Sequence, residues 1–313
     1  MTAFLYALVK DHKIYVEQPY GYVQYAKDGS ALVCLLLKSL YGLKQAPFLW
    51  FEELTSFLKS KGFNSIRPLH LPALHDQRYY RCIQKLLTDR FKMKCLGDLP
   101  FYLGCRIMRN RAKREIYLIQ DAYVEQLLEK YNVESLNAID TPMAPGSRLT
   151  KAPDDYVPTS NFLNEYQSLV GRLIWLSLQT RPDITFAVAQ LSRHLVSPTT
   201  YHLNVGKRVL RYLKGTSKYG IIIKGDSGED FKVEGYTASS YADNRDDGTS
   251  TGAYVFHING SLISWKCVKQ RTVSLSSTEA EQNAAVTTTQ EAAYIAALCV
   301  EFKLIDKVTP ITI

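Results

Sequence analysis

Long apolar runs are missing from this 313-residue sequence, and none approaches the roughly 20 consecutive apolar residues that a membrane-spanning helix needs. The first residues also lack the charged and then apolar segments of a secretory signal. Both absences argue against a membrane or secreted protein. We expect an intracellular protein, in the cytoplasm or the nucleus, without a membrane partner, and the sequence carries no signal for an oligomeric state.

Paired cysteines are missing as well. The six cysteines are scattered without a Cys-x-x-Cys pair, and the six histidines do not join them at the spacing of a zinc site. We therefore expect free thiols in a reducing compartment and no structural metal. The sequence also offers no Gly-rich phosphate loop, no Ser-His-Asp set and no Cys-His pair for a different enzyme.

Charge and hydrophobicity are present in ordinary amounts for a globular protein, with 46% hydrophobic and 22% charged residues. The 38 basic residues exceed the 30 acidic ones and give a formal net charge of +8. Such an excess favours anionic partners, nucleic acid first.

The N-terminal part predicts short elements around a gap in the pattern. Residues 13–18 alternate as a strand, and residues 31–38 form an apolar run typical of a buried strand. Residues 46–61 and 78–92 have helical periodicity, with Pro47 in the first turn of the former helix. Between these helices, residues 66–77 show two prolines and no sustained period, so they form a junction.

The middle of the chain predicts a strand pair at residues 99–108 and 115–119, then a helix at 121–131. Residues 141–161 contain four prolines and are the best candidate for a linker. A long helix is expected over residues 162–195.

A second long helix, residues 199–214, carries a row of basic residues opposite its apolar positions. This row consists of Lys207, Arg208, Arg211 and Lys214, and Gly215 suits the position just after the helix. The row predicts either phosphate contact or an ordinary solvated face.

The C-terminal block predicts three strands, at residues 231–237, 251–258 and 262–268, and a long helix from Ser276 to about Phe302. Asn259-Gly260 is a strong hairpin signal between the last two strands. Ser276 and Glu279 can form a capping box at the start of the helix. The last residues, from Pro310, have the pattern of a fourth strand.

Several motifs in this order carry a resemblance. "KIYVEQPYGY", "SLYGLKQAP", "FKMKCLGDLPFYLGCRI", "YQSLVGRLIWLSLQTRPDITFAVAQLSRH" and "SSTEAE" together resemble the polyproteins of copia-type LTR retrotransposons. The resemblance covers nearly the whole chain and runs from reverse transcriptase through a connecting region to ribonuclease H.

The resemblance implies an α+β fold, with a partial reverse-transcriptase palm, a helical thumb and connection, and an incomplete ribonuclease H-like α/β domain. The expected sections are partial palm and fingers (1–65), a junction where an Asp-Asp hairpin is missing (66–77), palm end and thumb-like region (78–140), linker (141–161), helical connection (162–225) and truncated ribonuclease H-like domain (226–313).

In the polymerase part, the resemblance places the turn containing Gly42, Lys44 and Gln45 beside the templating base pair. Gln45 would approach the incoming nucleotide, and Gly42 would allow close packing of backbone against substrate. The family holds two Mg²⁺ ions with aspartates. The first aspartate position precedes Met1, and the Asp-Asp hairpin is not found between Gly62 and Phe91, where the only acids, Asp76 and Asp89, are expected to be solvated.

In the ribonuclease H part, the family's first catalytic aspartate corresponds to Ala238 and a second family aspartate to Ser240. Glu281 matches the catalytic carboxylate on the helix, and a further carboxylate is expected beyond Ile313. Glu281 is thus the sole surviving ribonuclease H carboxylate, which is insufficient for two divalent ions. The nearby acids Asp243, Asp246 and Asp247 are expected to serve turn formation.

Three readings fit these residues. The first is a degenerate, truncated and inactive fragment of a copia-type polyprotein. The second is a retained nucleic-acid-binding protein without catalysis, which would bind DNA or an RNA–DNA hybrid weakly. The third is an active reverse transcriptase whose gene model has lost exons. Whether the chain is an enzyme stays open, and no cofactor is expected as given, although intact family members use Mg²⁺.

Overall fold

The computed structural model describes residues 3–9, 13–63, 77–94, 97–225, 231–302, 304–305 and 311–313, with the backbone alone for residues 77–80. The chain divides into two compact units, Met1–Gly97 and Asp98–Ile313. The expected linker 141–161 lies inside the second unit. Residues 141–159 form no helix or strand and contribute Leu149 to the core, and Ser160 begins a helix. Helices and antiparallel sheets together make the fold α+β, as expected.

The first unit has short strands and two helices. Its elements are η1 (Ala3–Tyr6), β1 (Tyr15–Val16), β2 (Cys34–Leu35), α1 (Ala46–Ser60) and α2 (Gln77–Phe91). Both predicted helices are confirmed, with Pro47 in the first turn of α1. Phe91 is buried, and the rings of Tyr6, Trp50 and Phe57 lie 5.0–5.4 Å from its ring, which joins η1, α1 and α2 through aromatic packing.

The prediction of a buried strand over residues 31–38 is wrong. Only Cys34–Leu35 forms a strand, paired with β1, while the two ends of the run, Ala31 and Lys38, make isolated bridges. Val33 and Leu37 are 58% and 71% exposed. An apolar run is buried only where a second layer covers it, and within the described part of this unit no helix or sheet covers both faces of the hairpin.

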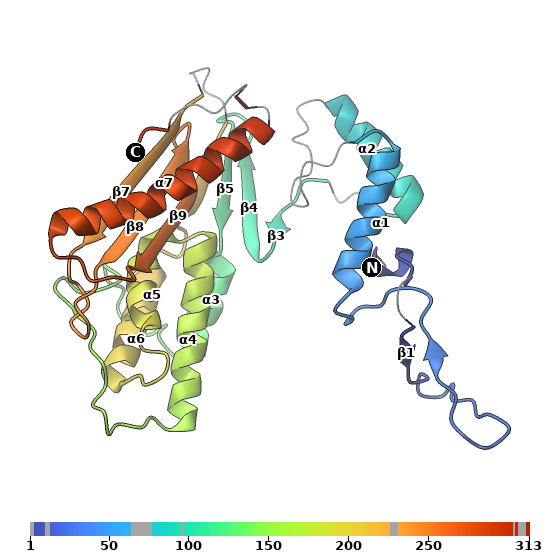
Figure 1. Ribbon diagram of the computed structural model, residues 1–313, viewed down its shortest axis with the longest axis horizontal. Coiled ribbons are helices and arrows are strands. Elements are labelled where there is room, and N and C mark those ends of the chain that lie inside the picture. The colour runs from blue at the N-terminus through green and yellow to red at the C-terminus, as the bar shows by residue number, and fades with distance from the viewer. Residues whose placement is uncertain are drawn as a thin grey trace. The chain divides into compact units, whose positions relative to one another are not determined.

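The second unit begins with a four-stranded antiparallel sheet in the order β3-β4-β5-β6. Its strands are β3 (Phe101–Tyr102), β4 (Cys105–Asn110), β5 (Glu115–Ile119) and β6 (Gly220–Lys224). The strand predicted over 115–119 is confirmed as β5. The single strand predicted over 99–108 is wrong, because Leu103 and Gly104 adopt positive φ and turn the chain between β3 and β4, which pair with each other. β6, distant in sequence, pairs with β5 because the intervening helices return the chain to the sheet (Figure 1).

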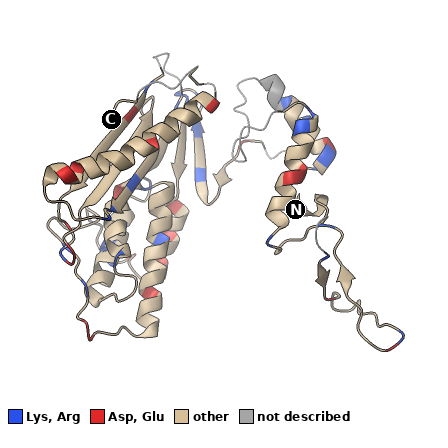
Figure 2. Ribbon diagram, in the orientation of Figure 1, with Lys and Arg blue, Asp and Glu red and all other residues tan. Residues whose placement is uncertain are grey.

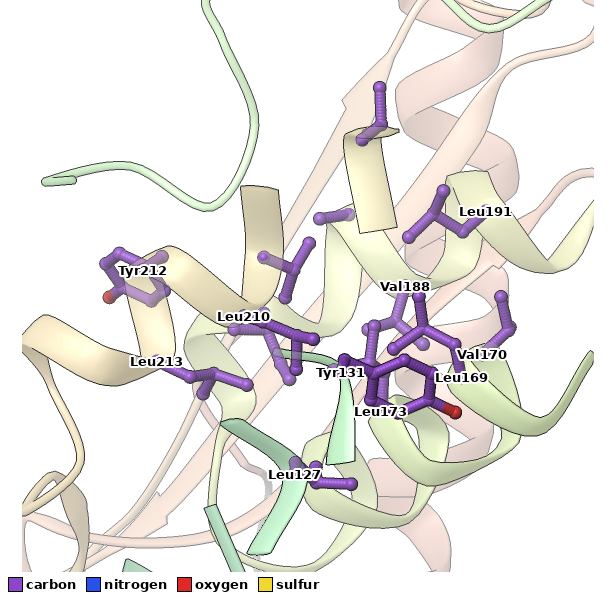
Figure 3. Packing of buried hydrophobic residues seen from close by; sticks show 14 of the residues in the cluster. Leu127, Tyr131, Leu169, Val170, Leu173, Val188, Leu191, Leu210, Tyr212 and Leu213 are labelled. Carbon is purple, nitrogen blue, oxygen red and sulfur yellow. The ribbon is translucent and has the colours of Figure 1, made fainter. Parts of the chain in front are cut away.

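The helices of this unit enclose its main core. They are α3 (Asp121–Lys130), α4 (Ser160–Gln179), η2 (Pro182–Ile184), α5 (Thr185–Ser192) and α6 (Thr200–Gly215). Apolar residues from all four α-helices meet in one cluster, including Leu127, Leu169, Leu173, Val188 and Leu210 (Figure 3). Full burial of each such side chain stabilises the fold by about 1.5–3 kcal/mol, so this cluster dominates the stability of the unit.

Two expectations about these helices need correction. The single helix predicted over 162–195 is broken after Gln179, because Pro182 has no N–H to continue the hydrogen-bond ladder and restricts Arg181 before it. Gly215 is the last residue of α6, and Thr216 caps the helix. A Cβ at Gly215 would lie 3.1 Å from the Cβ of Ala138, so this glycine permits close packing.

The unit ends with a three-stranded antiparallel sheet and a long helix. These elements are β7 (Val233–Ser240), β8 (Thr251–Ile258), β9 (Ser261–Lys269) and α7 (Ser277–Glu301), as predicted. Asn259 and Gly260 both adopt positive φ, 46° and 71°, which confirms the hairpin turn. Thr312 forms a parallel bridge to Glu234, and its carbonyl accepts a hydrogen bond from Gly235 N–H at 2.8 Å, as a fourth strand would require.

Helices cover both faces of this sheet. α7 crosses one face (Figure 1), where Ser264 of β9 bonds Glu291 at 2.7 Å. On the other face, Trp265 Nε1 donates to the Ser177 carbonyl of α4 at 2.7 Å. Among the described residues, no helix is long and apolar enough to cross a membrane.

Candidate functional site

Glu281 lies in the first turns of α7 and reaches the edge of β7. One of its carboxylate oxygens accepts a hydrogen bond from Ser239 N–H at 3.1 Å, and the residue is exposed. Further along the same two elements, the buried Thr288 hydroxyl donates to the Thr237 hydroxyl at 2.9 Å. This crossing of α7 over β7 holds the Glu281 carboxylate beside residues 237–240.

Ala238 and Ser240 lie on the face of β7 that is turned away from α7. Thr237 faces α7, and side chains alternate along a strand. Ser240 is paired in register with Thr251, whose hydroxyl accepts a hydrogen bond from Arg193 at 2.5 Å, just after α5. The fold therefore brings positions 238 and 281 to the same end of β7, but from opposite faces.

A hollow of about 450 Å³ lies at this second face, lined by the segment 141–148, by α5 and by two carboxylates. Each carboxylate is paired with an arginine. Arg181 lies 2.7 Å from Asp183, and Arg193 lies 3.6 Å from Asp243. Asp183 also accepts from Tyr212 of α6 at 2.8 Å, and Asp243 accepts from Gln190 of α5 at 2.6 Å. These acids therefore hold neighbouring elements together.

The other two acids of the turn after β7 also have partners inside the chain. Asp246 accepts a hydrogen bond from Lys151 N–H at 2.9 Å, and Asp247 accepts from Thr249 N–H at 3.1 Å and from Lys269. Burial pushes the pKa of Asp247 upward, but the hydrogen bonds from Lys269 and Thr249 outweigh it and lower the pKa to about 2. In the described part of the chain, no three His, Cys, Asp or Glu side chains are grouped to hold a metal ion.

The three residues expected near a nucleotide lie in the turn before α1. Gly42 has a φ of +98°, which an L side chain rarely adopts, and no atom lies within 4 Å of where its Cβ would be. Backbone conformation therefore explains this glycine within the chain itself. Lys44 and Gln45 are exposed, and Gln45 caps α1 without a side-chain hydrogen bond.

The basic row of α6 contacts the preceding segment 134–141. Its hydrogen bonds run from Arg208 to the Thr141 hydroxyl (2.9 Å), from Arg211 to the Asn137 carbonyl (2.8 Å) and from Lys214 to the Glu134 and Leu136 carbonyls (2.6 and 2.9 Å). Lys207 lies 3.9 Å from Glu165. Phosphate contact by this row stays a prediction, and it would require these side chains to exchange carbonyl partners for phosphate oxygens.

Comparison with known proteins places these features in a family. Residues 1–71 match the family model described as reverse transcriptase (RNA-dependent DNA polymerase). The chain is 35% identical over 321 residues to the retrovirus-related Pol polyprotein from transposon RE2 of Arabidopsis thaliana, covering 96% of this chain and 21% of that protein. It is 34% identical over 333 residues to the Pol polyprotein from transposon TNT 1-94 of Nicotiana tabacum, covering 98% of this chain and 24% of that protein.

A shorter relative matches end to end. The putative transposon Ty5-1 protein of Saccharomyces cerevisiae is 30% identical over 312 residues, which cover 93% of this chain and 98% of that protein. The chain belongs to the copia-type retrotransposon Pol polyprotein family. It spans less than a quarter of the two plant polyproteins.

Within this Pol segment, the reverse-transcriptase match contains Gly42, Lys44 and Gln45. The junction expected at 66–77, with Asp76, lies outside the described residues except for Gln77, so the predicted loss of the Asp-Asp hairpin is not tested by the structure. Asp89 is exposed on α2, as expected of a solvated acid.

Some features of the Pol segment were not foreseen from its sequence. Arg181, 1% exposed, donates to Asp183 and to the Thr216 carbonyl and hydroxyl. His194 and His202 stack with ring centroids 4.1 Å apart. The Arg-Pro-Asp sequence at 181–183 marks a helix break, but Tyr212 and Thr216, its partners in α6 and just after it, lie 29 and 35 positions away and give no local signal. The five cysteines in described segments are free, as predicted.

Proposed function

We propose that this Pol segment is a non-catalytic remnant of the reverse transcriptase and ribonuclease H region that retains weak nucleic-acid binding. The observation that carries the proposal is at the end of β7. Glu281 accepts a hydrogen bond from Ser239 N–H there, while alanine and serine occupy positions 238 and 240.

The donor set at this end of β7 does not fit a pair of Mg²⁺ ions. Mg²⁺ takes oxygen ligands, usually including carboxylates, in near-octahedral geometry. Of the positions 238, 240 and 281, only Glu281 carries a carboxylate, because the methyl group of Ala238 has no lone pair and the Ser240 hydroxyl is neutral. Hydrolysis between two metals needs both ions held together.

We assign the C-terminal sheet and α7 to a ribonuclease H-like domain as part of this proposal. Three antiparallel strands, a helix across one face and the parallel bridge from Thr312 to Glu234 support the assignment. The helices α3 to α6 then correspond to the thumb and connection, and the first unit to the remaining palm.

Nucleic acid is the partner class that the family and the charge favour. The net charge of +8 attracts a polyanion, and the N-terminal match is to reverse transcriptases. Because the proposed attraction is to the charged backbone and not to base edges, binding should be independent of nucleic-acid sequence and should weaken steeply with salt.

Nucleotide incorporation tests the polymerase half of this proposal. The purified chain, given a primed RNA or DNA template with Mg²⁺ or Mn²⁺, should incorporate no labelled nucleotide above a buffer blank, because its sequence has no Asp-Asp pair between Gly62 and Phe91, where the family's hairpin is expected.

The matched control is Gln45→Ala, which alters the exposed turn that the family places at the nucleotide. Incorporation by the wild-type chain that falls in Gln45→Ala would overturn the proposal, whereas incorporation unchanged by the substitution would identify a contaminating host polymerase.

A further inference from the structure

Lys and Arg occur on helices, strands and loops of each unit, interspersed with Asp and Glu (Figure 2). The clearest local candidate for an anion-binding site is a hollow of about 410 Å³ formed by β9, the end of β8 and α7.

The hollow exists because α7 does not cover β9 fully. β9 is the last strand of its sheet. α7 lies close to β8 at Gly252, where an added Cβ would come within 3.2 Å of the Ala284 Cβ. The helix therefore packs closely against β8. The same face of β9 is left uncovered beside the helix, and Lys266 and Val268 are exposed there.

The side chains around the hollow are cationic or neutral. Lys266 and Arg271 are exposed, and within the described residues neither forms a hydrogen bond or ion pair. Lys269 is paired with Asp247 at the rim. None of the described lining residues is acidic. Glu291 on α7 is not among the lining residues, but its carboxylate bonds Ser264 at 2.7 Å and the hydroxyl of Tyr254, which lines the hollow, so this acid already has partners.

Hydrogen bonds between neutral groups fix one wall of the hollow. The Gln270 amide donates to the Ala280 carbonyl at 2.8 Å, and Gln270 accepts from the Ser274 hydroxyl at 3.2 Å. Asn283 donates to the same hydroxyl at 3.2 Å. These bonds tie the loop after β9 to α7, so the wall is set before a ligand arrives. Gln290 and Thr287 on α7 face the hollow from the other side.

We propose that this hollow between β9 and α7 binds one nucleotide unit of a single-stranded nucleic acid, with Lys266 and Arg271 contacting its phosphates. Its volume is within the roughly 300–1,000 Å³ of small-ligand pockets. Lys and Arg are the donors that pair best with phosphate oxygens. The inference rests on the proposed nucleic-acid binding and names the surface that performs it.

The lining also sets the character of binding. Tyr254 is the one aromatic residue in the described lining, and it is buried, so no exposed ring offers a stacking platform for a base. Affinity should come from charge and hydrogen bonds to the backbone, without preference for base sequence.

The test uses the full chain and a short fluorescent single-stranded DNA, with anisotropy measured over a salt series. Lys266→Gln combined with Arg271→Gln should flatten the slope of log affinity against log salt by about 1.4, because each single-strand phosphate contact contributes about 0.7. Thr287→Phe, which fills the hollow without changing charge, should weaken binding as well.

The matched control is Lys218→Gln combined with Arg245→Gln. Both residues are exposed and neither lines the hollow, and the pair removes the same charge. This control should leave the slope within about 0.5 of wild type. Inorganic phosphate at matched ionic strength should not displace the DNA, and an RNA–DNA hybrid should compete less well than the single strand.

Two outcomes overturn the inference in distinguishable ways. Equal slopes for the two double variants, with wild-type binding intact, would show that nucleic acid binds elsewhere and would leave the proposed function standing. No binding by the wild-type chain would contradict both this inference and the proposed nucleic-acid binding. A melting temperature equal to that of the wild-type chain would show that a variant is folded.

Discussion

Replacing Arg181 with methionine should lower the free energy of unfolding of the second unit by about 3 kcal/mol, the low end of the range for removing one partner of a buried ion pair. Arg181 is 1% exposed, and its guanidinium donates to both oxygens of Asp183 and to the Thr216 carbonyl and hydroxyl. Among the described residues, its loss leaves the Asp183 carboxylate with the hydrogen bond from the Tyr212 hydroxyl at 2.8 Å, and it removes the contacts that Arg181 makes with Thr216 at the end of α6.

Urea unfolding monitored by circular dichroism measures this change. Arg172→Met on α4 is the matched control, because Arg172 makes one long contact, 3.4 Å, to Ser168. It should cost less than about 0.5 kcal/mol, as surface substitutions usually do. Equal losses in the two variants would mean that the Arg181 network contributes no more than an ordinary arginine.

Acidification should destabilise the second unit through the stacked pair His194 and His202. Burial lowers the pKa of His194 to about 4, with repulsion from His202 adding to it, and burial also lowers the pKa of His202. Asp246 opposes the shift of both, and Arg193 reinforces that of His194. The unfolded chain, with histidine pKa near 6.5, therefore binds more protons than the folded one.

Acid therefore destabilises the folded state relative to the unfolded chain. Stability should be full above about pH 6.5 and should fall as the pH drops toward the folded pKa of about 4. His194 alone should contribute a loss of about 2 kcal/mol between about pH 7 and pH 5. His194→Phe keeps a stacked ring without a titrating group and should remove most of that loss. A pH profile identical in this variant would contradict the assignment.

Most of the secondary structure of this Pol segment was predicted from the sequence, because turns, helix caps and periodic apolar positions are set by residues close together in the chain. Asn259-Gly260 turns the last hairpin, and the Ser276 hydroxyl accepts from Glu279 N–H at 3.1 Å at the start of α7. In a capping box the Glu279 carboxylate would accept from the Ser276 N–H. Here it accepts from the N–H of the preceding residue, Leu275, at 2.7 Å. Such features depend on neighbours within a few positions.

Features decided by distant partners were predicted less well. Residues 31–38 read as a buried strand, but burial depends on a covering layer that the sequence pattern does not specify. The cations of α6 read as a phosphate-contacting or solvated row, but Arg211 and Lys214 hold carbonyls about 75 positions earlier. The hollow beside β9 depends on how closely α7 approaches Gly252, which only the packed fold determines.

At the end of β7, sequence identified the residues and the fold supplied their directions. From the sequence, Ala238 and Ser240 were predicted to stand where the family has carboxylates, and Glu281 was expected beside them; this correspondence stays a prediction. The alternation along β7 adds that Ala238 points away from α7, toward the side of α5. A carboxylate restored there would approach the Glu281 region around the strand edge.

The most direct test of the proposed loss of catalysis is gel analysis of a labelled RNA–DNA hybrid incubated with Mg²⁺ and the wild-type chain, Ala238→Asp, Glu281→Gln, or the combination of both changes. We predict no RNA cleavage by any of the four, because one restored carboxylate on the opposite face of β7 from Glu281 does not hold the paired metal geometry that hydrolysis needs. Cleavage by the wild-type chain or by Ala238→Asp that disappears when Glu281 is changed to Gln would contradict the account.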